Sequence, residues 1–482
     1  MSSTKMNLQL LLVACEKGDL VVVESLSTKN PRLISKANNQ GWTPLLLASF
    51  NGRLEVVQFL LSNGAKKEFD LPSGETPLFL ASSKNHCDVV KFLICEGLDK
   101  ETANEDGTTP LFIATQNGHV DVVELLLSAG VEDKAVLGAT SLYIACQYGH
   151  LEIVKLLVTP GVVDKSTKGT PLYIACLCGR LDVVRLLVSY GGDVDEANVD
   201  SPECKGAVGS TPFFAACYGG HFEIVRFLLS VHVDKDKRRV DDAGATPFLV
   251  ACEEGHTDIV RLLLSHGVDK EKPSKRGETP LEIACYMGHL EIVKLLLAGA
   301  ANIDDALGRS PLFVECRLGP LFAACRGGNG NLKTVKFLIK KGFDLNEARK
   351  YDGATPLHFA CQEGATDVAK LLICSGADTN KISYFGRKAL DMCSTGEMRA
   401  VLEDSIALMS GGGVITRRKG RSCACCDGKE GEGAGTIGGP PKFHICSSCR
   451  FVAYCSKSCQ SRDWTARHKK ECKVFQSISS VR

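Results

Sequence analysis

Apolar residues in most of this chain are grouped into short runs that predict pairs of helices. One run follows a Thr-Pro step, as in Leu45–Leu47, and a second run such as Val122–Leu127 follows a polar turn and ends near Gly130. Threonine accepts hydrogen bonds from the free amides at a helix start, and proline suits the first helical position. Glycine commonly ends a helix. The pattern therefore predicts a mainly α chain of repeated helix pairs.

The helix-start motif recurs with a period of about 33 residues. Its copies are Thr43-Pro44, Thr76-Pro77, Thr109-Pro110, Thr170-Pro171, Thr211-Pro212, Thr246-Pro247, Thr279-Pro280 and Thr355-Pro356. This pattern resembles the ankyrin repeat, and the resemblance covers about residues 5 to 405. It implies a solenoid of about 11–12 repeats, whose concave face of finger loops and first helices binds proteins.

Two places depart from the period. Residues 192–208 lengthen one unit and predict a longer finger loop. Near 308–330 one unit begins at Pro311 and another at Pro320, which leaves no room for the second helix of the first unit. A kink, a bulge and an error in the gene prediction all remain open here. The array ends in a degenerate unit with a short helix to about Asp404, which fits a capping repeat.

The 23 cysteines of the chain do not indicate a secreted disulfide scaffold. Equivalent residues on neighbouring packed helices lie roughly 8–10 Å apart, beyond the reach of about 7 Å that a disulfide allows. A cysteine in such a position acts as a small buried apolar residue. We therefore predict a reduced, intracellular protein. The cysteines in this slot of the first helix are Cys15, Cys146, Cys176, Cys217, Cys252, Cys285, Cys325 and Cys361.

Other polar residues of the array also recur, and we assign no catalytic role to them. The histidines occupy the turn between the two helices of a unit or, for His358, the helix start. Asp-Lys steps fall in the finger loops, where we expect solvated hairpin residues rather than a binding ladder. The histidines are His86, His119, His150, His221, His256, His289 and His358, and the aspartates are Asp99, Asp133, Asp164, Asp234 and Asp269.

The C-terminal part of the chain carries Cys and His pairs at zinc-ligand spacing. Short steps between two such residues let one turn of backbone present both to a tetrahedral ion. The four pairs make two complete sites, and a site without an open position indicates structural zinc. The pairs are Cys423 and Cys426, Cys446 and Cys449, Cys455 and Cys459, and His468 and Cys472.

The stretch from Tyr454 to Gln460, together with Trp464 and the His468–Cys472 step, resembles the MYND zinc finger. The resemblance implies that two zinc ions are chelated in an interleaved order. One ion would then be held by Cys423, Cys426, Cys455 and Cys459, and the other by Cys446, Cys449, His468 and Cys472. Spacing alone also allows sequential pairing. The family binds short proline-containing peptides, with Gln460 and Trp464 at positions that match its groove, although Trp464 could equally pack in the core.

We place the domain boundaries at the changes in composition. Residues 406–421 form a glycine-rich and basic linker, 422–473 the finger and 474–482 a tail. A loop longer than is usual in the family, 427–442, contains a G-x-G-x-x-G match at 433–438, but a nucleotide site needs a strand before it and a helix after it. Cys425 is left as a free thiol. His444 could compete as a ligand, but it suits neither site better.

The net charge of +1 hides a basic C-terminal segment, since residues 417–482 hold more Lys and Arg than Asp and Glu. A basic zinc module invites a nucleic-acid interpretation. The negative charge of the zinc-bound thiolates lowers the positive charge of the module, so we consider nucleic-acid binding the less favoured interpretation. Leu10–Cys15 is too short to cross a membrane. We predict a cytoplasmic protein, and the run Arg417–Arg421 leaves nuclear import as an alternative.

These patterns together predict a non-enzymatic adaptor that binds protein partners on the array and proline-containing peptides on the finger. No catalytic triad, paired carboxylates or phosphate loop is present in the sequence. Two rivals remain: a transcription-associated regulator that contacts nucleic acid, and an enzyme. A ubiquitin-ligase-like module would need a different order of ligands. A methyltransferase would need a catalytic domain for which the repeats leave no room.

Overall fold

A computed structural model gives the fold and describes 3–67, 71–133, 136, 139–158, 170–197, 209–239, 244–298, 319–350, 352–409, 444–445 and 453–454. The chain divides into two compact units, Met1–Val250 and Ala251–Arg482. Each unit is described by itself below. None of the helices in these ranges is both long enough and apolar enough to cross a membrane.

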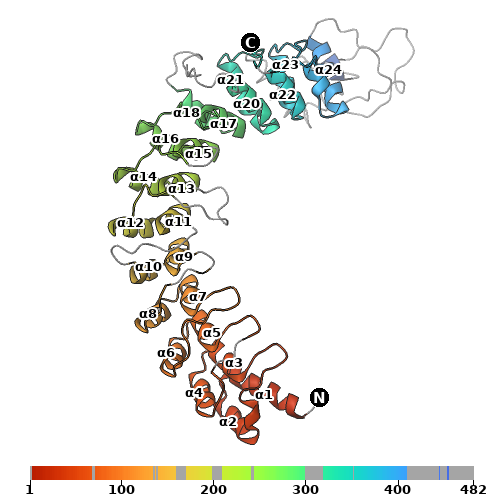
Figure 1. Cartoon of the computed structure of the whole chain (residues 1–482). Helices are drawn as coiled ribbons and strands as arrows, with labels where there is room; N and C mark the ends of the chain where they lie inside the picture. Colours follow the sequence, from red (N-terminus) through yellow and green to blue (C-terminus); the bar gives the residue numbers. More distant parts are fainter. Residues whose placement is uncertain are drawn as a thin grey trace, which may run out of the picture. The chain divides into compact units, whose positions relative to one another are not determined.

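The first unit is a row of antiparallel helix pairs. In Figure 1 the first helices α3, α5 and α7 lie on one side of the row with the loops between repeats, and the second helices α4, α6 and α8 lie on the other. The pairs are α1 (Ser3–Lys17) with α2 (Leu20–Lys29), α3 (Pro44–Phe50) with α4 (Leu54–Ser62), α5 (Pro77–Ser83) with α6 (Cys87–Cys95), α7 (Pro110–Gln116) with α8 (Val120–Ser128), α9 (Ser141–Tyr148) with α10 (Leu151–Leu157), α11 (Pro171–Leu177) with α12 (Leu181–Ser189), and α13 (Pro212–Tyr218) with α14 (Phe222–Ser230). A 3-10 turn, η1 (Pro31–Leu33), follows α2.

The second unit continues the same plan. The helix α15 (Pro247–Glu253) contains the boundary between the units. The pairs are α15 with α16 (Thr257–Ser265), α17 (Pro280–Met287) with α18 (Leu290–Leu296), α20 (Pro320–Arg326) with α21 (Leu332–Lys340), and α22 (Pro356–Gln362) with α23 (Thr366–Cys374). Shorter elements are η3 (Asn329–Asn331) and η4 (Ala389–Met392), and the array closes with α24 (Gly396–Met409).

The predicted helix starts are confirmed. The hydroxyl of Thr43 accepts a hydrogen bond from the amide of Leu46 at 3.3 Å, and Pro44 occupies the first turn. The same bond recurs at Thr76, Thr109 and Thr211. Because each start is specified within four residues, the sequence pattern is sufficient to place it.

The predicted burial of the repeat cysteines is also confirmed. All eight are buried, from Cys15 at the first helix to Cys361 in α22. Burial raises the pKa of the Cys15 thiol to about 12, and it raises the pKa of Cys217 further still. The remaining cysteines of the described ranges are free thiols as well. These side chains pack as small apolar residues in the core of each first helix.

The stacking of repeats resumes within the irregular stretch near 308–330, at α20. Helices α17 and α20 pack directly against each other, although residues 288–319, which include α18, separate them in sequence. The Nδ2 of Asn331 donates to the carbonyl oxygens of Cys285 and Tyr286 at 3.0 and 2.6 Å, and of Ala324 at 3.1 Å. The repeat of α17 and α18 is therefore followed immediately by that of α20 and α21. Residues 299–318 and the start at Pro311 lie outside the described residues.

Other predictions can be placed only in part. In the extended loop 192–208, residues 198–208 lie outside the described ranges, while α11 and α13 on either side of it are direct neighbours. Helix α24 continues to Met409, past residue 405 where we placed the end of the array. That domain boundary stays a prediction.

Candidate interaction surfaces

The finger loops of several repeats share one hairpin frame. A glycine in the fourth position donates its N–H to the carbonyl oxygen of the first residue at 2.8–3.1 Å, and the first N–H donates to the fifth carbonyl at 2.8–3.1 Å. The glycine has a positive φ, as at Gly41 with 87°, which other residues rarely adopt. The second and third residues form the exposed tip. These fingers are 38–42, 71–75, 104–108, 274–278 and 383–387.

Histidines of the inter-helix turn join neighbouring repeats, as their recurrence indicated. The Nε2 of His119 donates to the carbonyl oxygen of Ser83 at 3.1 Å, and that of His289 to Glu253 at 2.9 Å. His86, His150 and His221 make the same bond. Their role in the fold is structural, because each satisfies a carbonyl at the end of the preceding first helix.

Most of the described finger-loop aspartates are exposed, as expected of solvated residues, and they also make ordered hydrogen bonds. Asp99 accepts hydrogen bonds from the amide of Glu101 at 3.0 Å and the hydroxyl of Thr102 at 2.8 Å. Lys270 donates to the carbonyl oxygen of Leu296 at 3.1 Å. These side chains therefore shape the loops and connect them to the adjoining repeat while Asp99, Asp234 and Asp269 stay exposed to solvent. Asp164 lies outside the described residues.

Several first helices carry exposed large side chains near their ends. Tyr148 and Tyr218 are exposed in the first unit, and Tyr286 and Met287 in the second. They stand between the buried Ala-Cys step and the following turn. We did not single them out from the sequence, although the two residues that follow the Ala-Cys step differ from repeat to repeat while the step itself recurs.

The predicted zinc and peptide residues lie outside the described residues. They are Cys423, Cys426, Cys446, Cys449, Cys455, Cys459, Gln460, Trp464, His468 and Cys472. The backbone of two short strands is described between them: β1 (His444–Ile445) pairs antiparallel with β2 (Ala453–Tyr454), His444 opposite Tyr454.

The strand pair fits the proposed ligand set in one respect. Cys446 directly follows β1 and Cys455 directly follows β2 in the sequence. Antiparallel strands run in opposite directions, so the two ligand pairs continue from opposite ends of the ladder. Structural zinc takes four thiolate or imidazole ligands, so two such pairs complete the coordination of one ion. Interleaved and sequential pairing both keep these two pairs on different ions.

Comparison with known families agrees with this architecture. A family model described as "Ankyrin repeats (3 copies)" matches residues 2–70, 66–136, 128–198, 196–274, 213–306 and 312–383. A second, described as "MYND finger", matches residues 423–472. MYND fingers bind zinc, so the C-terminal module is a zinc-binding one.

Individual relatives match shorter stretches. The chain is 50% identical over 64 residues to Protein phosphatase 1 regulatory subunit 27 of Mus musculus and of Homo sapiens, which is 13% of this chain and 41% of each relative. It is 45% identical over 65 residues to BTB/POZ domain-containing protein 3 of Schizosaccharomyces pombe, 14% of this chain and 12% of that protein. The chain therefore spans less than half of each of these relatives.

Proposed function

Because the chain belongs to the ankyrin repeat proteins and carries a MYND zinc finger, we propose that it is a non-enzymatic adaptor with two separate binding surfaces. Ankyrin repeats and MYND fingers are protein-interaction modules. The relative named as a regulatory subunit supports a role without catalysis. The shared segment is too short a part of that protein for its partner to be carried over.

The observation that carries the proposal is that the residues that hold the backbone of the array recur among its repeats, whereas the exposed residues at the finger tips differ. Threonine caps, inter-helix histidines and buried cysteines recur from repeat to repeat. All of them stabilise the fold, by capping helices, joining repeats or filling the core. The finger tips share one backbone geometry but carry unrelated side chains. A scaffold that fixes its backbone and varies only exposed positions is suited to recognition.

The finger at the C-terminus supplies the second surface. We propose that it holds two structural zinc ions through the eight Cys and His residues, in the interleaved order. Trp464 and Gln460 would then contact a proline-containing peptide, because an indole packs on a proline ring and an amide pairs with an extended backbone. Tethering both surfaces in one chain raises the local concentration of one partner near the other.

Titration of a fluorescein-labelled P-x-x-P peptide with the full-length chain tests the second surface. We expect Trp464→Ala to weaken binding about tenfold or more, as removal of a central aromatic contact does, and to leave the zinc content unchanged. Loss of zinc from this variant would instead place Trp464 in the core. Equal binding by the wild type and by Trp464→Ala and Gln460→Ala would contradict the groove.

Two further measurements address the rivals. We expect no ubiquitin chains when the purified protein is mixed with ubiquitin and its activating and conjugating enzymes, and chain formation would overturn the non-enzymatic role. We propose a cytoplasmic location. Nuclear accumulation of a fluorescent fusion, lost when Arg417 and Arg418 are changed to Ala, would show instead that the basic run acts in import.

A further inference from the structure

The last finger of the array, 383–387, differs from the others that share its frame. The tips of the other fingers are polar or carry proline: Asn39-Gln40, Pro72-Ser73, Glu105-Asp106 and Lys275-Arg276. The tip of this finger is Tyr384-Phe385, yet its hairpin bonds are the same, with Gly386 N–H 2.9 Å from the Ser383 carbonyl oxygen. The turn therefore does not require aromatic residues.

These aromatic side chains are left in solvent. Tyr384 is 70% exposed and Phe385 is 74% exposed, and Ile382, which directly precedes the finger, is 55% exposed. Single exposed apolar residues are common, but three on one loop form a local patch, and such patches mark interaction sites. The aromatic rings offer large contact area with few rotatable bonds.

The backbone that carries the patch is held in place. The N–H of Tyr384 donates to the carbonyl oxygen of Asp352 at 2.8 Å; Asp352 lies in the preceding finger, which the hydrogen bond from the Arg349 N–H to the Ala354 carbonyl oxygen closes. A Cβ on Gly353 would lie 2.8 Å from Cδ1 of the Tyr384 ring, so the ring lies against bare backbone there. At the base of the finger, Nε2 of His358 donates to the Arg387 carbonyl oxygen at 3.2 Å.

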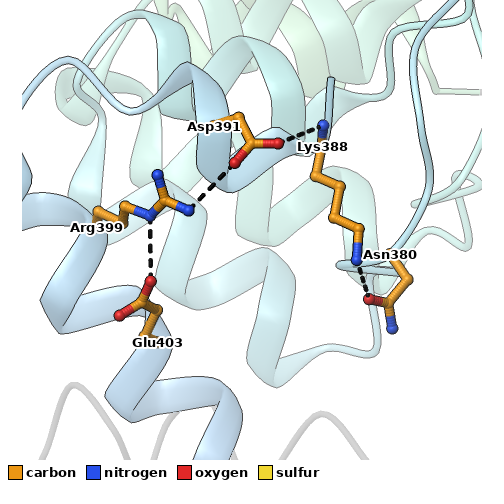
Figure 2. Close-up of polar contacts among 5 residues, drawn as sticks. All are labelled: Asn380, Lys388, Asp391, Arg399 and Glu403. Carbon is orange, nitrogen blue, oxygen red and sulfur yellow. Dashed lines mark hydrogen bonds and ion pairs between the residues drawn. The ribbon is translucent and has the colours of Figure 1, made fainter. Parts of the chain in front are cut away.

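Figure 2 shows how the residue after the finger is fixed. The backbone N–H of Lys388 donates to Asp391 at 3.0 Å, while its side chain turns away and donates to Asn380 at 3.1 Å. Arg399 of α24 pairs with Asp391 at 3.2 Å and with Glu403 at 3.1 Å. Loops fixed in this way lose little entropy when a partner binds.

Positive charge accompanies the patch. Arg387 on the same finger and Lys350 on the preceding one are exposed. The nearby carboxylate of Asp352 is bonded to Arg349, and this bond is the main reason why the pKa of Asp352 lies below its usual range. The pair is largely neutral as a unit. The remaining charge of the two finger tips is therefore basic.

We propose that the 383–387 finger binds an acidic peptide segment of a partner protein that carries a bulky apolar side chain. That side chain packs against Phe385 and Ile382, and carboxylates on either side of it pair with Lys350 and Arg387. A nucleic acid fits this surface less well, because single-stranded nucleic acids are bound in a positively charged groove that follows the phosphate backbone, whereas the exposed basic residues beside this finger are Lys350 and Arg387.

This inference rests on the proposed function of the array as a binding platform. A synthetic peptide tests it. The probe is a fluorescein-labelled twelve-residue chain of Glu and Asp with one central Trp, titrated with the full-length protein. We expect the double variant Tyr384→Asn, Phe385→Gln, which installs the tip of the 38–42 finger, to bind about tenfold more weakly. We expect a similar loss for Lys350→Glu with Arg387→Glu, and weaker wild-type binding at high salt.

A swap variant is the matched control. It combines the change above with Asn39→Tyr and Gln40→Phe, so its composition and net charge equal those of the wild type. We expect it to bind as weakly as the double variant, because Trp42 stands in the place of Arg387 at the new position. Circular dichroism checks that each variant is folded.

Four results would overturn the proposal. They are equal binding by the swap variant, equal binding of a probe with Gln in place of Glu and Asp, equal binding of a probe with Ser in place of Trp, and tighter binding of a single-stranded RNA oligonucleotide. If the acidic peptide does not bind, the result of the proline-peptide titration of the zinc finger is not affected. The adaptor role and the nature of the array's partner are thus tested separately.

Discussion

The imidazole of His221 lies with its Nε2 2.9 Å from the carbonyl oxygen of Leu177, the last residue of the preceding first helix. Arginine replaces histidine in this slot at two other repeats, where the Nε of Arg53 donates to Glu16 at 3.0 Å and that of Arg180 to Gln147 at 3.1 Å. The constant feature is therefore an N–H donor aimed at a helix end, not an imidazole.

From this relationship we predict that His221→Ala lowers the free energy of unfolding by about 1 kcal/mol, since the Leu177 carbonyl loses its partner. His221→Arg should keep most of the stability, because arginine serves at the equivalent positions. Urea denaturation followed by circular dichroism measures both. Equal stability of the alanine variant and the wild type would contradict a stabilising role for the bond.

The junction of α17 and α20 should depend on one amide. Asn331→Ala removes the donor shared by the Cys285 and Tyr286 carbonyls, and we predict a loss of about 2 kcal/mol, typical of buried groups left unpaired. Asn331→Asp should cost more, because it places acceptors against acceptors. Asn63→Ala is the matched control: its exposed side-chain amide donates to the Phe59 carbonyl oxygen of the helix that it follows at 2.8 Å, and we expect a loss of less than about 0.5 kcal/mol.

Stability near α22 should fall in mild acid. His358 donates through Nε2, so its Nδ1 is the acceptor for the Thr355 N–H at 3.1 Å and must stay unprotonated. Burial, partly opposed by the bond to Arg387 and the charge of Asp352, lowers the pKa of His358 below its ordinary 6.5. The stabilising contribution is then present above about pH 6.5 and is lost as the pH falls through the lower folded value.

Hydrogen exchange of residues 355–362 between pH 7.5 and 5 measures this effect, after correction for the intrinsic exchange rate. His358→Leu should remove the additional acid sensitivity, since Leu46 and Leu249 occupy the equivalent position in other repeats. A wild type whose protection does not change over this range would refute the assignment.

The zinc finger should release its ions in a way that identifies their ligands. We predict two zinc ions per chain by elemental analysis. Changing Cys423, Cys426, Cys455 and Cys459 together to Ser should leave about one ion if the pairing is interleaved, because one site of four ligands stays intact. The control set Cys423, Cys426, Cys446 and Cys449 should leave none. The opposite outcome would establish sequential pairing.

Much of the array could be predicted because its signals are local. A Thr-Pro step places a helix start within a few residues, and an Ala-Cys step places a buried side chain on the next turn. The partner of each histidine could not be predicted, because the carbonyl that it meets belongs to another repeat. Asn331 was also missed, since two extra residues precede it and it does not resemble the histidine whose slot it fills.

The candidate sites, too, could be predicted only as far as local sequence determines them. Spacing predicts which residues bind zinc, but the ligand count is the same for both pairings. The finger patch was visible only after the hairpin frames were aligned, because Tyr384 and Phe385 read as ordinary apolar residues until their turn positions were known. Exposure depends on three-dimensional neighbours, such as Asp352 and Gly353, that the local pattern does not name.

The direct contact between α17 and α20 has a consequence for how such a protein can change over evolution. Adjacent repeats there are matched by their own side chains rather than by the length of chain that joins them. The entropy of closing a connection grows only slowly with its length. The interval 299–318 can therefore gain or lose whole coding segments, or accept a grafted domain, while the two helices keep their register.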